Sequence, residues 1–397
     1  MSYQAYSCLP DAPKPNSVAL IDTEALANNY RALATLAKAR AARPIAVVKA
    51  DAYGHGIPIC VPTLLRQGCD FFAVASLAEA IATRTAAQQQ GAHPDILIFG
   101  YTDPADTALL LQHDLIQSVL SEEHGHALAT AAKALGVTPR VHLAADTGMN
   151  RVGFCTHSEE LLRNTVLAIE GLQKSGTLLI EGLFSHLARA DEPDEEIALA
   201  STKRQVARFA TLVESLEQKG IRPAVCHLCN SAGLVTCPEA AFDAVRLGIA
   251  LYGCAPVKGM PPLAPVMRLE TRAVHLHQLL PGECVGYGGE FSAASPRTVA
   301  TLPIGYADGF LRAYRNATVS IYTATGHHRV PVVGRVCMDQ CMLDVTDTAA
   351  AVGDRVVLFG EEVGDTERLA RIGNTIPYEV MTSISARIPR QVPKKRQ

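Results

Sequence analysis

Residues 44–56 read PIAVVKADAYGHG, an apolar run that passes into a polar turn with two glycines. Residues 45–48 are apolar at successive positions and three of the four are β-branched, which is typical of a strand buried on both faces. Lys49 follows this run directly. Strands of this kind belong to parallel sheets, so further units of a strand and a crossover helix are expected along the chain.

Seven more apolar runs follow, separated by segments long enough for a crossover helix, such as 77–90, 122–135 and 194–219. Another helix is predicted before the first run, capped by Asp22 or Thr23, with Leu26 and Tyr30 on its buried side. The eight runs are 45–48, 71–75, 96–99, 116–120, 141–145, 178–184, 224–228 and 244–247. Eight units within about 250 residues predict an α/β fold, a closed (β/α)8 TIM barrel.

The pattern changes after Tyr252. Four prolines between 256 and 265 predict a linker, and the runs at 299–302, 319–322, 330–333, 342–345 and 355–359 favour strands. One short helix is expected at 366–372. We therefore predict two domains, a barrel at 1–258 and a β-strand-rich domain at 259–397.

Composition excludes several classes of function. Lysine and arginine total 36 against 39 acidic residues, so the chain has no electrostatic footprint for nucleic acid. No apolar stretch reaches the length of a membrane helix, and no signal sequence is visible, so a cytoplasmic protein is expected. The 11 cysteines are scattered, which favours reduced thiols. Cys226 and Cys229 have zinc-like spacing without a second pair, so no metal is predicted.

In a β/α barrel the active site lies where the strands end, so the polar residues that follow each run are candidates. Lys49 ends the first strand, and an amine in a desolvated barrel mouth suits Schiff-base chemistry. Asn230 and Ser231 follow the seventh strand, and Gly248 and Ile249 follow the eighth, where such barrels often bind phosphate. A phosphate site with a lysine indicates pyridoxal phosphate, although sugar-phosphate aldolases share both features.

Longer motifs resemble those of the alanine racemases, and they occur in the order found in that family. They are 46–56 (AVVKADAYGHG), 146–151 (DTGMNR), 182–186 (GLFSH), 230–232 (NSA), 245–253 (VRLGIALYG), 303–309 (PIGYADG), 334–340 (GRVCMDQ) and 376–379 (IPYE). They span nearly the whole chain. The resemblance implies a pyridoxal-phosphate-dependent enzyme that racemises alanine and supplies D-alanine for peptidoglycan.

The resemblance also implies roles for individual residues. Lys49 would carry the cofactor and act as the base on one face of the substrate, and Tyr287 would act on the other. Racemisation needs a base on each face, because the proton removed from one side must return from the opposite side. His186 and Arg246 would support the tyrosine, and Arg246 would face the pyridine nitrogen, where a guanidinium weakens the electron sink and favours return of the proton.

Further residues are implied as contacts. Arg151, Met338 and Tyr306 would bind or admit the amino-acid substrate. The second domain would complete the active site of a partner, so a homodimer is expected. The implied cofactor contacts, besides Lys49 and Arg246, are Tyr53, Asn230, Ser231, Gly248, Ile249 and Tyr378.

Two positions depart from the family pattern. Ala144 stands where a carbamylated lysine usually braces the carboxylate-binding arginine, and Asn150 stands where glycine is common. These differences leave open a serine racemase or one of broader specificity. A decarboxylase of the same fold would place an acid rather than Arg246 near the pyridine nitrogen. A non-catalytic pyridoxal-phosphate carrier would lack the second domain and Tyr287.

Overall fold

The computed structural model describes residues 14–393. Its first part is a barrel of parallel strands in the order β10, β2, β3, β4, β5, β6, β8, β9, and the short β7 (Phe154–Cys155) pairs with β6 outside this path. The barrel strands are β2 (Arg43–Val47), β3 (Phe71–Val74), β4 (Asp95–Ile98), β5 (Ile116–Val119), β6 (Arg140–Asp146), β8 (Leu179–Phe184), β9 (Val225–His227) and β10 (Ala244–Leu247). Each predicted run forms one of them, so the TIM barrel is confirmed.

Hydrogen bonds between β9 and β10 bring the two ends of this sheet together. The N–H of Asp243, just before β10, donates to the Cys226 carbonyl of β9 at 2.9 Å, and the N–H of Arg246 in β10 donates to the carbonyl of Cys229, just after β9, at 3.0 Å. The strands are apolar on both faces because one face packs in the barrel core and the other against helices.

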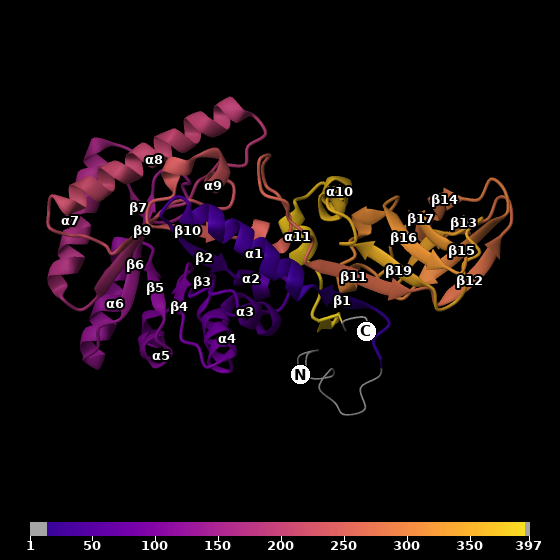
Figure 1. Ribbon diagram of the computed structural model, residues 1–397, viewed down its shortest axis with the longest axis horizontal. Coiled ribbons are helices and arrows are strands. Elements are labelled where there is room, and N and C mark those ends of the chain that lie inside the picture. Colours follow the sequence, from indigo (N-terminus) through magenta and orange to yellow (C-terminus); the bar gives the residue numbers. More distant parts are fainter. Residues whose placement is uncertain (1–13, 394–397) are drawn as a thin grey trace.

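Helices cover the outside of the barrel (Figure 1). Asp22 caps the first helix by accepting the N–H groups of Glu24 and Ala25, both at 2.9 Å, as the sequence predicts. Ser76, Ser121, Ser158 and Asp194 cap four others in the same way. The helices are α1 (Thr23–Lys38), α2 (Lys49–Tyr53), α3 (Ile57–Leu65), α4 (Leu77–Gln88), α5 (Thr107–Gln112), α6 (Glu122–Leu135), α7 (Glu159–Ser175), α8 (Glu195–Glu217) and α9 (Gly233–Thr236).

The second part is mostly β, as predicted. Its main sheet has the order β12, β15, β18, β17, β16, β19, β11, β1, β20, and β13 pairs with β14. The bounds are β1 (Val18–Ile21), β11 (Met267–Arg272), β12 (His275–Leu279), β13 (Cys284–Val285), β14 (Phe291–Ser292), β15 (Arg297–Leu302), β16 (Thr318–Thr323), β17 (Gly326–Val333), β18 (Cys341–Asp344), β19 (Arg355–Phe359) and β20 (Arg390–Gln391), with helices α10 (Asp365–Gly373) and α11 (Pro377–Thr382).

The two parts are tied together by the N-terminal strand. Strand β1 pairs antiparallel with β11, with Val18 opposite Glu270, and thus belongs by hydrogen bonding to the second sheet. Asn29 of α1 holds the start of the connection to β11, because its amide bonds the backbone of Leu251 and Ala264. The expected boundary between residues 258 and 259 falls in the connection to β11. Strand β1 precedes this boundary in the sequence but pairs with the sheet of the second part.

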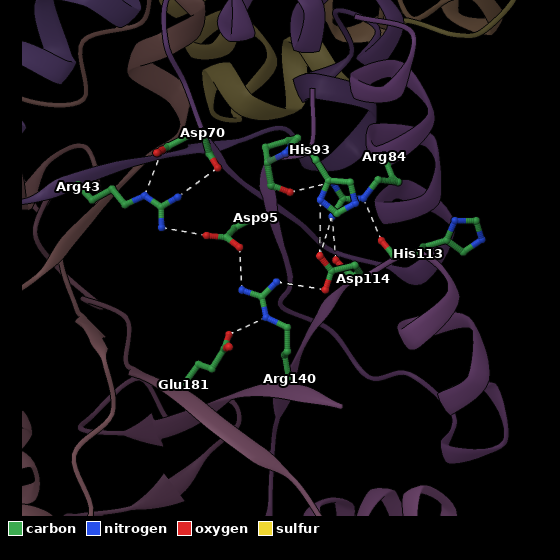
Figure 2. Close-up of polar contacts among 10 residues, drawn as sticks. Arg43, Asp70, Arg84, His93, Asp95, His113, Asp114, Arg140 and Glu181 are labelled. Carbon is green, nitrogen blue, oxygen red and sulfur yellow. Dashed lines mark hydrogen bonds and ion pairs between the residues drawn. The ribbon is translucent and has the colours of Figure 1, made fainter. Parts of the chain in front are cut away.

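The bottom of the barrel is closed by ion pairs (Figure 2). Arg43, Asp95 and Arg140 each begin a strand, and Asp95 accepts hydrogen bonds from Arg43 at 2.9 Å and from Arg140 at 2.7 Å. Arg43 also bonds Asp70, and Arg140 also bonds Glu181. The charged side chains at this end of the barrel are paired with one another. The active site of such a barrel is expected at the opposite end, where the strands have their carboxyl termini.

Candidate active site

A cavity of about 530 Å³ lies at the carboxyl ends of the barrel strands. It is lined by ten residues that the sequence predicts for the site: Lys49, Tyr53, Arg151, His186, Asn230, Ser231, Arg246, Gly248, Ile249 and Tyr378. Nine of them come from the barrel. Tyr378 comes from α11, the element of the second part that contacts α2.

Lys49 begins an unusual turn. The next four residues, Ala50 to Tyr53, have φ between 52 and 56°, which is the left-handed region. L-residues there cost roughly 1–2 kcal/mol each, so surrounding contacts must hold the turn. The turn closes with its own hydrogen bonds, from the Ala52 N–H to the Val48 carbonyl and from the Gly54 N–H to the Ala50 carbonyl, both 2.8 Å. It places Lys49 at its start and Tyr53 at its end on one cavity.

Two carboxylates fix this left-handed turn. Glu79 of α4 accepts the Ala50 N–H at 2.6 Å and the Ala75 N–H at 2.8 Å, which joins the ends of β2 and β3. Asp51 accepts the Ile57 N–H at 2.7 Å. Glu79 is therefore a positioning residue for the lysine.

Cations surround the Lys49 amine. Burial lowers its pKa, the nearby Arg151 and Arg246 lower it further, and Glu79 opposes them. A neutral amine is the nucleophilic form. The environment therefore favours the form of Lys49 that attacks an aldehyde.

Arg246 lies in the barrel interior, 3% exposed. Its Nη1 donates to His227 Nδ1 at 2.7 Å, and its Nη2 donates to His186 Nδ1 at 3.1 Å and to the Ser185 and Leu228 carbonyl oxygens at 2.6 and 2.9 Å. These partners are neutral, since burial and the guanidinium hold the pKa values of both histidines well below the usual value. Burial also lowers the pKa of Arg246, to about 10, which leaves it charged at neutral pH.

Hydroxyl and N–H donors form the other end of the cavity. The Gly248 N–H donates to Ser231 Oγ at 2.9 Å, and a Cβ at Gly248 would lie 2.8 Å from the Tyr53 hydroxyl oxygen. Tyr53 stacks on Tyr252 with 4.7 Å between ring centroids. Burial raises the pKa of Tyr53 and of Tyr378, so both hydroxyls remain protonated. A space that a methyl group would fill, ringed by such donors, fits a phosphate group.

Arg151 ends a loop that Asp146 organises. Asp146 Oδ1 accepts the Gly148 and Asn150 N–H groups at 2.9 and 3.1 Å. Asn150 has φ 56°, a left-handed conformation that glycine and asparagine adopt most easily, which explains the asparagine at this position. Within residues 14–393, no carboxylate forms an ion pair with Arg151, and Ala144 is buried. The brace found in the family pattern is thus absent from the described part of the chain.

Three predicted site residues lie outside this cavity. Tyr287, Tyr306 and Met338 belong to the second part, and their exposed fractions are 71%, 40% and 54%. The segments of Tyr306 and Met338 are joined, because the Ala307 N–H, next to Tyr306, donates to the Met338 carbonyl at 3.0 Å. Figure 1 shows β13 and β14, which flank Tyr287, at the end of the molecule remote from the barrel.

The sequence analysis missed Glu79, His142 and His227. Polar residues that follow an apolar run are visible in the sequence as candidates, whereas both histidines lie within strands, in β6 and β9. A histidine inside a buried apolar run is itself a signal, because a buried imidazole needs a partner. Glu79 has a weaker signal, since a glutamate three residues after Ser76 also fits an ordinary helix cap.

No metal site is evident. Among the residues that the structure describes, no three His, Cys, Asp or Glu side chains are gathered so that they could hold an ion. Cys226 and Cys229 are buried. Nor does any helix between residues 14 and 393 have the length and apolar character to cross a membrane.

Both parts of the chain are similar to known proteins. Family models described as the alanine racemase N-terminal and C-terminal domains match residues 21–256 and 266–392. Alanine racemase 1 of Clostridium acetobutylicum is 37% identical over 378 residues, which covers 93% of each chain.

Solved structures agree. The alanine racemase of Clostridium difficile 630 superposes with a TM-score of 0.86 at 33% identity, covering 97% of each chain. A histidine racemase from Leuconostoc mesenteroides gives a TM-score of 0.83 at 28% identity, covering 96% of this chain and 99% of that one. The chain therefore belongs to the alanine racemase family, whose members are pyridoxal-phosphate-dependent isomerases.

Proposed function

We propose that the chain interconverts L-alanine and D-alanine with Lys49 and Tyr287 as bases on opposite faces of the substrate Cα, and so supplies D-alanine for peptidoglycan in the cytoplasm. One observation carries the proposal: the Lys49 amine shares a cavity with Arg246, whose terminal nitrogens bond neutral acceptors only. This pairing of a nucleophilic amine with a fixed cation suits racemisation.

The cavity residues fit pyridoxal phosphate. Lys49 would bind it covalently, and Tyr53, Ser231, Gly248, Ile249 and Tyr378 would hold its phosphate. Asn230 shapes the same wall by accepting the Gly233 N–H at 2.9 Å. When bound, the cofactor supplies an aldehyde for the substrate amine and an electron-withdrawing ring that makes the Cα proton acidic.

Arg246 argues for racemisation over decarboxylation. A guanidinium keeps its protons, so the ring nitrogen of a cofactor held beside Arg246 would stay unprotonated and the ring would withdraw electrons less strongly. Return of the proton to Cα would then be favoured over competing reactions. Asp191 is the acidic residue among those lining the cavity, and it does not bond Arg246.

Arg151 would bind the substrate, and His186 would support the tyrosine base. The exposed Arg151 guanidinium on the loop held by Asp146 would bind the substrate carboxylate. His186 accepts from Arg246 through Nδ1, so the neutral ring carries its proton on Nε2. That N–H would support the phenolate of a tyrosine base.

The exposure of Tyr287, Tyr306 and Met338 supports a homodimer with shared sites. Three exposed side chains with large apolar surfaces in one domain favour an interface. A two-fold dimer would bring this group to the partner's cavity and that of the partner to this one. The presence of this second domain also argues against a non-catalytic carrier.

Tyr287→Phe tests the two-base scheme. Racemisation should be lost in both directions, while the bound cofactor keeps its absorbance. Exchange of the Cα proton with deuterated solvent should persist for one enantiomer, because Lys49 still serves one face. Exchange retained equally for both enantiomers would contradict the scheme, and loss of the cofactor would assign Tyr287 a structural role.

Mixed dimers test the shared site. Inactive Lys49→Ala and inactive Tyr287→Phe subunits, refolded together, should regain activity in the heterodimer, because one of its two sites then contains both native residues. Verified heterodimers without activity would indicate sites built within one chain.

A broader-specificity racemase is the second candidate. Ala144 gives Arg151 a different setting from that of the family pattern, and a histidine racemase is among the structural neighbours. Racemisation rates for alanine, serine, lysine, arginine and histidine decide between the two. A kcat/KM for alanine well above the others supports the first proposal, and comparable values support the second.

A further inference from the structure

Two histidines fill the barrel interior beneath Arg246. His227 of β9 and His142 of β6 are 0% and 1% exposed, and neither lines the cavity. His227 Nδ1 lies 2.7 Å from Arg246 Nη1, and His227 Nε2 lies 3.1 Å from His142 Nδ1. We call these two residues the imidazole pair. Nothing in the proposed reaction requires His142 to touch the substrate or the cofactor.

The direction of these hydrogen bonds follows from Arg246. A guanidinium only donates, so His227 Nδ1 accepts and carries no proton. A neutral His227 then has its proton on Nε2 and donates it to His142 Nδ1. His142 in turn must be protonated on Nε2. The Arg246 guanidinium thus fixes the tautomer of His227, and His227 fixes the tautomer of His142.

Both rings of the imidazole pair are neutral. Burial lowers the pKa of His142 to about 3, helped by Arg140 at the bottom of the barrel. Burial, Arg246 and His142 hold the pKa of His227 well below its usual value. The pair therefore supplies acceptors to Arg246 without adding a second buried charge.

The surroundings leave one place for each ring. Gly182 lies opposite His142 in the β6–β8 pairing, and a Cβ there would be 2.4 Å from Nδ1 and Cε1 of the imidazole. Phe184 stacks on His227, with an interplanar angle of 10° and centroids 5.2 Å apart. Phe71 meets His142 edge-on. A glycine that leaves space for one ring indicates a site built around His142.

We propose that His142 is a positioning residue that acts through His227 to hold the Arg246 guanidinium toward the cavity. The inference rests on the proposed function in one respect, the role of Arg246 beside the cofactor ring. Without an acceptor at His142, the Nε2 proton of His227 has no partner, and the ring can turn or change tautomer. Either change removes the ring acceptor of Arg246 Nη1 at 2.7 Å and leaves that nitrogen only the His227 carbonyl oxygen at 3.1 Å.

A pair of substitutions separates this role from packing. His142→Asn keeps an acceptor oxygen the same number of bonds from Cβ as Nδ1, whereas His142→Phe fills the space and has no acceptor. We expect the Phe variant to lose about tenfold in kcat with little change in KM, as for one lost hydrogen bond, and the Asn variant to lose less. The Phe variant should also shift the absorbance of the bound cofactor and undergo more transamination per racemisation.

A substitution in the neighbouring strand β8 also perturbs His142. Gly182→Ala should displace the imidazole and reproduce the shift in cofactor absorbance. Gly171→Ala is the matched control, because a Cβ at Gly171 in α7 meets no atom within 4 Å. Full activity of His142→Phe with impaired His142→Asn would overturn the proposal, since packing alone predicts that order.

Nitrogen NMR of the unmodified holoenzyme tests the geometry without any variant. Both histidines should appear as the Nε2-protonated neutral tautomer between pH 6 and 9. A Nδ1-protonated or cationic ring at either position would refute the inference. This readout does not depend on racemase activity. If the enzyme racemised no amino acid, the proposed function would be wrong, and the tautomers would still test the role of His142.

Discussion

Gly248→Ala perturbs the phosphate end of the cavity by a single methyl group. The Cβ would lie 2.8 Å from the Tyr53 hydroxyl oxygen, and ordinary contact begins at about 3.4 Å, so the hydroxyl must move by roughly 0.6 Å. Tyr53 cannot retreat freely, because its ring stacks on Tyr252, and Tyr252 is held by a hydrogen bond to the Val47 carbonyl at 2.9 Å.

The expected loss is that of one hydrogen bond to a charged group, about 1.5–3 kcal/mol. Affinity for pyridoxal phosphate should therefore fall by about 10–100-fold. Titration of the apoenzyme with the cofactor, followed by absorbance, measures this directly. Gly171→Ala serves as the control and should bind the cofactor as the unmodified protein does.

A double-mutant cycle identifies the cause. Tyr53→Phe removes the hydroxyl and should weaken binding to a similar extent. In Gly248→Ala/Tyr53→Phe the methyl group has no hydroxyl to displace, so the two losses should not add. Additive losses, or unchanged affinity in Gly248→Ala, would refute the reasoning.

Three further predictions concern residues outside the phosphate end. Glu79→Ala should lower kcat at least about tenfold by freeing two backbone N–H groups, and Glu79→Gln should lower it less; wild-type kcat in Glu79→Ala contradicts this. Hydrogen bonds from Arg140 and Arg43 outweigh burial and lower the pKa of Asp95, so its contribution to stability is present above the unfolded pKa of about 3.9 and is lost as pH falls through the lower folded value. Asp95→Asn should thus reduce the free energy of unfolding by about 1–3 kcal/mol at pH 7, allowing for partial exposure of the side chain. The difference from the unmodified protein should be smaller below pH about 3.9. A difference that denaturation experiments find to be the same at both pH values would contradict this prediction. Because Ala144 cannot form a carbamate, activity should be independent of added bicarbonate, and stimulation by bicarbonate would show that another group braces the substrate arginine.

Local sequence pattern was sufficient for the barrel. Each of its strands is a short apolar run, and each run ends where the chain must turn, so the run that precedes Lys49 and those that follow it are visible without a structure. The pairing of β1 with β11 was not predictable in this way. Val18 and Glu270 are distant in sequence, and nothing in four apolar residues specifies which sheet they join.

The site was predictable to the extent that its residues follow strands. Lys49, Ser231 and Gly248 do so, and they meet at one cavity. The left-handed turn after Lys49 was not, because alanine and aspartate carry no signal for positive φ and the turn depends on Glu79 from another helix. The exposed position of Tyr287 likewise has no local signature, and in our proposal it depends on a second copy of the chain.

The central claim is that Lys49 binds pyridoxal phosphate in an amino-acid racemase. Borohydride reduction of the holoenzyme, followed by peptide mapping, tests it most directly. The account predicts a pyridoxyl group on the peptide that contains Lys49, and none on the corresponding peptide of Lys49→Ala treated in parallel. A pyridoxyl group on another lysine of the unmodified protein would contradict both the site and the assignment of the first base.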